Sequence, residues 1–160
     1  MPWRKLTHSH NMKIYKEIMG DIIKSPINAD ITIMAVLFRT ELFKRDFTKR
    51  QINILLLIYT LSLSLGKESA YIPNYHTDFS IAGVSHKKIK NEIDKLMKMN
   101  VILWEKEENL FSINTPQSWE VPCNQAYDKE RLKQLFMLNL EHLGIDVSSI
   151  IEKLKRRTKR

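Results

Sequence analysis

The sequence has few cysteine, glycine and proline residues. Cys123 is the only cysteine among 160 residues, which excludes an intramolecular disulfide framework and a zinc site made of several cysteines. Four glycines and five prolines leave little material for long flexible linkers. This low cysteine content is typical of a reducing compartment, and we therefore expect a cytoplasmic protein.

Long hydrophobic runs are also absent from the sequence. The most apolar run extends from Ile52 to Leu65 and is interrupted by asparagine, threonine and serine. A membrane-spanning helix needs about 20 predominantly apolar residues, and this run is shorter. It therefore predicts a buried helix of a packed core, and we expect no membrane partner.

Residue types that enzymes use are scattered along the chain. The five histidines do not form the two-histidine motif of helical metal sites, and the acidic residues do not cluster as they do where nucleases hold Mg²⁺. The neighbours of Cys123 do not favour a nucleophile, and a partly buried thiol without a chemical role is the simpler interpretation. The sequence therefore predicts no catalytic residues, no metal and no cofactor.

Positive charge, in contrast, is abundant. Lysine and arginine number 26 against 18 aspartate and glutamate residues, which gives a net charge of +8 and a pI of about 9.6. This balance favours a polyanionic partner, although a solvated basic surface without a ligand explains it equally well. The apolar fraction of 43% is sufficient for one packed core with appendages.

The best-defined helix signal begins at Thr48. Thr48 and Gln51 have the spacing of a capping box, in which each side chain accepts a hydrogen bond from a free amide of the first turn. Gly66 is a suitable terminating residue, so we predict a helix from Thr48 to about Leu65. Its apolar residues surround the axis almost completely, which predicts a position at the centre of the core.

Shorter segments flank this central helix. Asn11–Lys24 has apolar residues at helical spacing, and the second half of Asp30–Lys44 favours a helix, whereas its start is equally compatible with an extended chain. Further elements are expected after the central helix. They are a strand at Ala70–Ile72, a short helix at Tyr75–Ala82 with Phe79 and Ile81 inward, a turn at Gly83, a helix at Ser85–Met99, and strands at Val101–Glu105 and Leu110–Asn114 in a hairpin around Lys106–Asn109.

This order of elements is typical of a winged helix-turn-helix. We therefore predict a mainly α fold with a small β-hairpin and with helices added at both ends. The expected divisions are an N-terminal helical extension at 1–29, the winged helix-turn-helix at 30–116, and a C-terminal helical extension with a basic tail at 117–160. In the last part, Tyr127–Leu143 has an apolar stripe suited to dimerisation, and Ser148 is expected to cap a final helix.

The helix expected at Ser85–Met99 is the candidate DNA-recognition helix. Ser85 is a natural N-cap, and Ile89, Ile93 and Leu96 define the face toward the core. Lysine and asparagine then point away, where lysine can neutralise phosphates and asparagine can pair with adenine. A surface helix with a solvated lysine face is the more common alternative when the helix is considered alone. The DNA-binding residues that we predict are Ser85, His86, Lys87, Lys88, Asn91, Lys95 and Lys98.

The expected wing is acidic. Glu105, Glu107 and Glu108 accompany a single lysine, Lys106, and carboxylates repel phosphates. We therefore expect that the wing does not lie flat on a DNA backbone. Further positive charge must come from other segments, namely Lys44, Arg45, Lys49 and Arg50 or the C-terminal run from Lys153 to Arg160.

Two segments between about Ile33 and Ile113 suggest a family. They are RDFTKRQINILLLI and YIPNYHTDFSIAGVSHKKIKNEIDKLMKMNVI. With these segments the chain resembles the N-terminal domain of the phage replication protein O family, whose members bind a replication origin through a winged helix. The resemblance implies double-stranded DNA as a partner, action in the cytoplasm of a bacterial host cell, and contact of the C-terminal region with a helicase or helicase loader.

Three functions remain open from the sequence. The first is an origin-binding replication initiator of a phage or mobile element, and the second is a transcriptional regulator on the same fold. The third is a protein-interaction module whose winged helix no longer contacts DNA, which the acidic wing favours. We also expect a homodimer, because such domains often bind paired half-sites.

Overall fold

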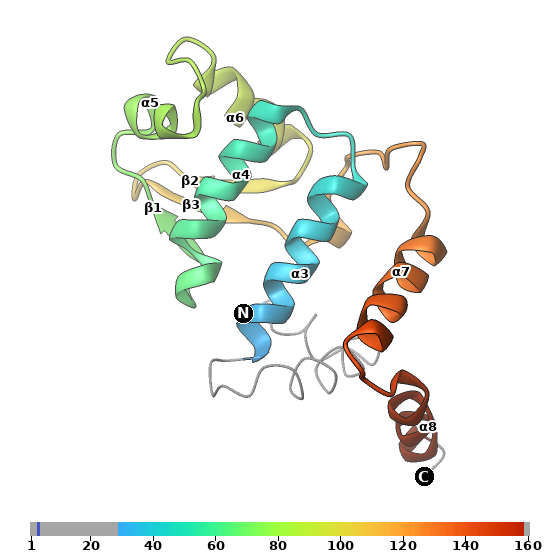
Figure 1. Ribbon diagram of the computed structural model, residues 1–160. Coiled ribbons are helices and arrows are strands. Elements are labelled where there is room, and N and C mark those ends of the chain that lie inside the picture. The colour runs from blue at the N-terminus through green and yellow to red at the C-terminus, as the bar shows by residue number, and fades with distance from the viewer. Residues whose placement is uncertain (1–2, 4–28, 159–160) are drawn as a thin grey trace.

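Residues 3 and 29–158 are described by a computed structural model of the protein (Figure 1). The helix predicted at Asn11–Lys24 lies outside these residues. Within them the chain is mainly helical and contains a three-stranded antiparallel sheet, an arrangement of the winged-helix type. Among the residues that the structure describes, the helices lack the combination of length and apolar character that a membrane span requires.

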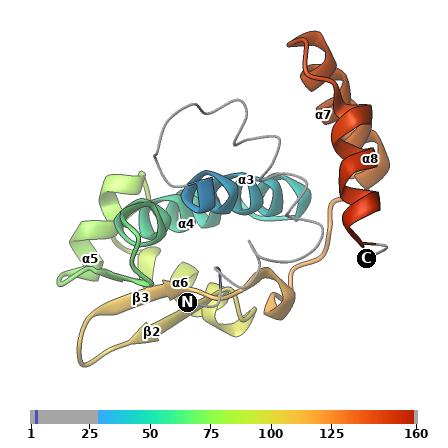
Figure 2. The same cartoon turned by 90° about the horizontal axis from the view of Figure 1, so that it is seen from below.

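Two long helices, α3 (Ala29–Lys44) and α4 (Lys49–Leu61), lie side by side (Figures 1 and 2). The segment whose start was open from the sequence is helical over its whole length. The rings of Phe38 on α3 and Tyr59 on α4 stack, with 4.3 Å between their centroids. Burial raises the pKa of Tyr59 to about 12, although the positive charge of Arg39 opposes the shift. Burial thus disfavours the ionised form of the phenol, which packs as part of the core.

The predicted capping box at the start of α4 is confirmed. The Thr48 hydroxyl accepts a hydrogen bond from the Gln51 amide at 3.2 Å. The Gln51 side chain accepts a hydrogen bond from the Thr48 amide at 3.0 Å. Two amides that the first turn leaves free are thereby satisfied, which fixes the helix start.

The C-terminal end of α4 lies earlier than predicted. The α-helix ends at Leu61, and a 3₁₀ helix (η1, Leu63–Leu65) leads to Gly66, whose φ is 76°. The Ser62 hydroxyl donates to the Ile58 carbonyl at 2.6 Å. Such local side-chain bonds compete with the helical pattern, and the serine and threonine residues near this end therefore favour its conversion to a tighter turn.

The sheet consists of β1 (Ser69–Tyr71), β2 (Ile102–Glu105) and β3 (Leu110–Ile113), in the order β1-β3-β2. Strands β2 and β3 form the predicted hairpin, with Trp104 opposite Phe111. Strand β1 pairs with the other side of β3, where its central residue is also opposite Phe111. A segment that precedes the helix-turn-helix therefore extends the hairpin to three strands.

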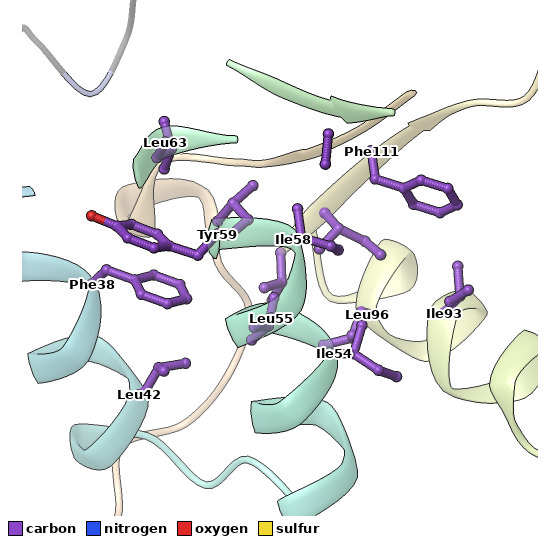
Figure 3. Close-up of a cluster of buried hydrophobic side chains, with 14 of the residues drawn as sticks. Phe38, Leu42, Ile54, Leu55, Ile58, Tyr59, Leu63, Ile93, Leu96 and Phe111 are labelled. Carbon is purple, nitrogen blue, oxygen red and sulfur yellow. The ribbon is translucent and has the colours of Figure 1, made fainter. Parts of the chain in front are cut away.

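Helix α4 lies at the centre of the core, as predicted (Figure 3). Its Ile54, Leu55 and Ile58 are completely buried. On one side of α4 lies α6 (Ile89–Lys98), whose Ile93 and Leu96 are also completely buried. Each such side chain contributes about 1.5–3 kcal/mol through burial. The inner face of α6 is therefore held firmly against α4.

The segment before the turn has two parts, α5 (Tyr75–Asp78) and the 3₁₀ helix η2 (Phe79–Ala82). Phe79 is buried as predicted. Its ring packs edge-on against the ring of Phe111, with 5.1 Å between the ring centroids. Ile81 is 79% exposed, so its predicted inward position is wrong. Residues two apart do not share a face of a helix, and in a 3₁₀ helix with three residues per turn they lie about 120° apart around the axis. Because Phe79 takes the inward side, Ile81 points away from it.

Helix α6 begins at Ile89, later than predicted, and Ser85 does not cap it. The Ser85 carbonyl accepts the Lys88 amide at 2.8 Å, which closes a separate turn. Val84 and Ile89 are both buried, and Gly83, with a φ of 76°, directs the chain toward the core. Because the apolar residues on both sides must reach the core, the intervening residues form a turn and not the first helical turn.

Two further helices, α7 (Lys129–His142) and α8 (Val147–Thr158), stand apart from α6 and the sheet in both views (Figures 1 and 2). Leu140 and Val147 form the centre of a separate small core between them. Gly144 follows α7 with a φ of 83°, which agrees with its predicted role as a terminating residue. These helices are therefore held to each other by few buried side chains.

The cap of α8 differs from the prediction. The Asp146 carboxylate accepts a hydrogen bond from the Ser149 amide at 3.0 Å. Ser148 is already part of the helix, so its predicted role as the cap is wrong. An aspartate and a serine two residues apart can both begin a helix, and only the observed helix start distinguishes them.

The chain after β3 returns to the central core. It contains the 3₁₀ helix η3 (Pro116–Ser118), and Trp119 and Val121 are buried in the same cluster as α4. The Asp46 amide donates to the Pro122 carbonyl at 2.9 Å. The predicted divisions at 29 and 116 stay a prediction.

We expect Thr48→Ala to lower the free energy of unfolding by about 1 kcal/mol, because it removes the capping box of α4. Ser85→Ala is the matched control. Ser85 is exposed and caps no helix, so we expect a change within about 0.5 kcal/mol. Urea unfolding of the wild type and both variants measures these values. Equal losses in the two variants would contradict the cap assignment.

Candidate nucleic-acid interface

The residues predicted to contact DNA all have exposed side chains. Asn91, Lys95 and Lys98 lie on α6, opposite a face that is buried through Ile89 and Ile93. The remaining predicted residues lie in the turn that precedes this helix. They are Ser85, His86, Lys87 and Lys88. One exposed surface, defined as the turn at 85–88 with the outer face of α6, therefore contains the whole predicted set.

The lysines are not distributed evenly on this surface. At 100° per residue, Asn91 and Lys98 point directly away from the buried face of α6. Lys88 and Lys95 lie on one flank, whereas Lys90 and Asp94 lie toward the other. The flank with Lys88 and Lys95 also borders the beginning of α4. This flank therefore has two lysines without an exposed carboxylate, whereas Asp94 offsets Lys90 on the other flank.

Hydrogen bonds fix the turn before α6 to two other helices. The side-chain amide of Asn53 on α4 donates to the Ala82 carbonyl at 3.1 Å. His86 Nδ1 donates to the His76 carbonyl at 2.9 Å, and the two imidazole rings are 5.4 Å apart. The turn is therefore tied to α5 through His86 and to α4 through the preceding η2, and His86 has a structural contact in addition to its predicted role.

A charged residue that the sequence did not indicate lies at the edge of this surface. Glu92 on α6 is buried, with 4% of the whole residue exposed. Its Oε1 lies 3.9 Å from Nη1 of Arg50 on α4, which is close enough for attraction but too long for a hydrogen bond. Its Oε2 is buried and has no hydrogen-bond partner among residues 3 and 29–158. One feature of the sequence could have indicated that Glu92 is buried. Its place in the helical repeat is at the border of the apolar stripe of α6.

The wing between β2 and β3 presents its carboxylates to solvent. Glu105, Glu107 and Glu108 are exposed. Nζ of Lys106 lies 5.0 Å from the ring centre of Trp104, a cation–π contact inside the protein. The lysine of the wing is thus engaged with the strand, which supports the expectation that the wing does not lie on a phosphate backbone.

Lys44 and Arg45, two of the further basic residues, have structural roles. Both pair with Glu41, with N–O distances of 3.1 and 2.7 Å. Arg45 also donates to the carbonyls of Val121 and Pro116, at 3.0 Å each. These contacts tie the end of α3 to the segment after β3. The two residues are therefore poor candidates for DNA contacts.

Lys49 and Arg50, in contrast, are exposed in the first turn of α4. This turn contains no acidic residue, although the positive end of the helix dipole favours carboxylates there and disfavours cations. A residue choice that opposes the local preference is typical of functional positions. Arg50 also borders α6, so it extends the basic surface onto α4.

The C-terminal basic run is separate from this surface. Helix α8 lies far from α6 in both views (Figures 1 and 2). Nη2 of Arg156 lies 3.9 Å from Oε2 of Glu152 one turn earlier, and both side chains are exposed. The described part of this run therefore does not add charge to the α6 surface.

Metal-binding side chains do not cluster in the described part of the chain, where no group of three or more histidine, cysteine, aspartate and glutamate residues could hold a metal ion. Cys123 is exposed, so the interpretation as a partly buried thiol is wrong. The expectation that the chain is not an enzyme stays a prediction.

A family model with the description Bacteriophage replication protein O matches residues 31–119. The match includes more than half of the 160 residues and extends from α3 through the sheet and α6. Helices α7 and α8 lie outside it. No curated protein and no solved structure matches the chain. The matched segment thus contains the turn and the helix that form the basic surface.

Proposed function

Because the chain belongs to the bacteriophage replication protein O family, we propose that it is an origin-binding replication initiator of a phage or mobile element. It binds double-stranded DNA in a sequence-specific manner through the turn at 85–88 and the outer face of α6. The family membership supports the role in replication. The observation that carries the DNA contact is the exposed basic surface on a helix whose other face is buried in the core.

Helix α6 enters the major groove, whose width of about 12 Å accommodates an α-helix. Lys87 and Lys88 in the preceding turn neutralise backbone phosphates, which sets the position of the helix on the duplex. Asn91 lies in the first turn of α6 and reads a base edge, since asparagine can pair with adenine through two hydrogen bonds. Lys95 and Lys98 contact the backbone further along the groove.

Two other functions fit parts of the same evidence. A transcriptional regulator has the same fold, because fold alone does not determine function. A protein-interaction module is favoured by one specific observation, the exposed carboxylates of the wing at Glu105, Glu107 and Glu108. The initiator is preferred because the matched family is a replication family.

We expect Lys87→Ala combined with Lys88→Ala to weaken binding to duplex DNA. Each lost phosphate contact lowers the slope of log K against log salt by about 0.9, so the double variant loses about 1.8. Fluorescence anisotropy at several salt concentrations measures affinity and slope. Lys67→Ala is the control, because Lys67 is exposed beyond the opposite end of α4. An unchanged affinity and slope in the double variant would refute α6 as the recognition helix.

The genomic distribution of bound sites distinguishes an initiator from a regulator. For an initiator we expect clustered repeats within an origin or within the coding region of the protein itself. Chromatin immunoprecipitation in the host, followed by sequencing, locates these sites. Isolated palindromes at promoters, without a cluster, are the result that favours the regulator.

A homodimer through α7 is part of the proposal. Leu135, Leu138 and Leu143 are 41, 51 and 68% exposed, and this apolar surface is suited to pairing with a second copy. We expect the wild type to be a dimer by light scattering and Leu138→Glu to be a monomer, because the carboxylate would be buried at the contact. Glu130→Gln, on the same helix, is the control. A monomeric wild type contradicts this part of the proposal.

The other partners follow from the family alone. Contact with a helicase or helicase loader, and action in the cytoplasm of a bacterial host cell, stay predictions. Helices α7 and α8 are the described elements beyond the matched segment, so they are the candidate surface for such a contact.

A further inference from the structure

Glu92 is an exception on a helix that presents mainly lysine and asparagine to solvent. Its side chain is 6% exposed, and its Oε2 has no hydrogen-bond partner among the described residues. Burial of an ionised carboxylate is costly unless the charge is paired and hydrogen-bonded. An incompletely paired buried charge at the edge of a candidate DNA-binding surface therefore requires an explanation.

Arg50 is the cation that faces this carboxylate. Its Nη1 lies 3.9 Å from Oε1 of Glu92, while 49% of the arginine side chain is exposed. The side chain thus reaches from a buried anion to solvent. A guanidinium has five N–H donors in a planar fork, so it can contact the carboxylate on one edge and a phosphate on another.

The place of Arg50 is unfavourable for α4 taken alone. It lies in the first turn of α4, where the helix dipole disfavours a positive charge and the turn itself contains no acidic residue. The contact with Glu92 places it on the flank of α6 that also contains Lys88 and Lys95. The position is therefore unfavourable for α4 alone but suitable for a surface shared by α4 and α6.

We propose that Glu92 is a positioning residue, which holds the guanidinium of Arg50 beside α6 so that Arg50 binds a backbone phosphate of the DNA. This inference rests on the proposed DNA binding and adds a contact from α4 to those from α6. The ion pair also connects the two helices. The phosphate contact and the orientation of the recognition helix are consequently linked through Glu92.

The sign of the effect of Glu92→Gln distinguishes this role from simpler ones. Removal of a negative charge near DNA reduces repulsion, so a glutamate without a specific role gives tighter binding after substitution. A positioning residue gives weaker binding, because the neutral amide no longer holds Arg50. A residue that only supports the packing of α6 weakens binding by the same factor whether or not Arg50 is present.

The test is a double-mutant cycle on the full chain with Arg50→Ala, Glu92→Gln and the double variant. Binding to a mixed-sequence duplex of about 30 base pairs, enough for two half-sites, is measured by anisotropy at several salt concentrations. We expect Arg50→Ala to lower the affinity about tenfold at 0.1 M salt and the salt slope by about 0.9. We expect Glu92→Gln to lower the affinity about threefold or more in the wild type, and not at all in the Arg50→Ala background. Lys67→Ala controls for loss of one distant positive charge.

Equal effects of Glu92→Gln in the two backgrounds, whether gains or losses of affinity, overturn the positioning role. Thermal unfolding shows whether each variant is folded. If Glu92→Gln does not fold, Arg50→Lys decides, because lysine keeps the charge but lacks the planar fork. An affinity equal to that of the wild type then overturns the proposal, and a lower one supports it.

Failure of the proposed function gives a different result. A wild-type chain that does not bind duplex DNA overturns DNA binding and, with it, the role of Glu92. Binding by the wild type without coupling between Arg50 and Glu92 overturns the positioning role alone.

Discussion

The burial of one broad face of α4 is the constraint on which the rest of the structure depends. Ile54, Leu55 and Ile58 are fully buried, so neighbouring elements must cover this face, whereas Leu56 on another side of the helix is 40% exposed. Helix α3, the three-stranded sheet and α6 supply that cover, and the capping box at Thr48 fixes where α4 begins. The outer face of α6 is exposed because its inner face is committed to α4. The candidate DNA-binding surface is thus a consequence of how the core is completed.

The same constraint gives different roles to two arginines, Arg45 and Arg50, that are close in sequence. Arg45 lies before the capped start of α4 and is engaged by Glu41 and by carbonyls of the returning chain. Arg50 lies after that start and borders Glu92 on α6, with about half of its side chain exposed to solvent. The first arginine holds the fold together, whereas the second is available to a partner. A count of positive charges does not distinguish them, but their positions relative to Thr48 do.

Local signals in the sequence predicted the elements whose boundaries depend on nearby residues. The capping box, the hairpin around Lys106–Asn109 and the exposure of the lysines of α6 are of this kind. The predicted start of α6 was wrong because the burial of Val84 decides it. The predicted inward position of Ile81 was wrong because residues two apart do not share a face of a helix, and Phe79 takes the inward side. Glu92 was missed because an acidic residue at the border of an apolar stripe can face either way, and only packing against α4 determines which. The third strand likewise depends on a long-range pairing of β1 with β3.

We propose that the turn at 85–88 and the outer face of α6 form the DNA contact of this protein. Titration of the ¹⁵N-labelled chain with duplex DNA, followed by amide chemical shifts, locates the contact residue by residue. We expect the largest changes on residues 85–98 and on Arg50, whereas the amides of α8 are unaffected. Changes confined to α7 and α8, with residues 85–98 unchanged, would contradict it.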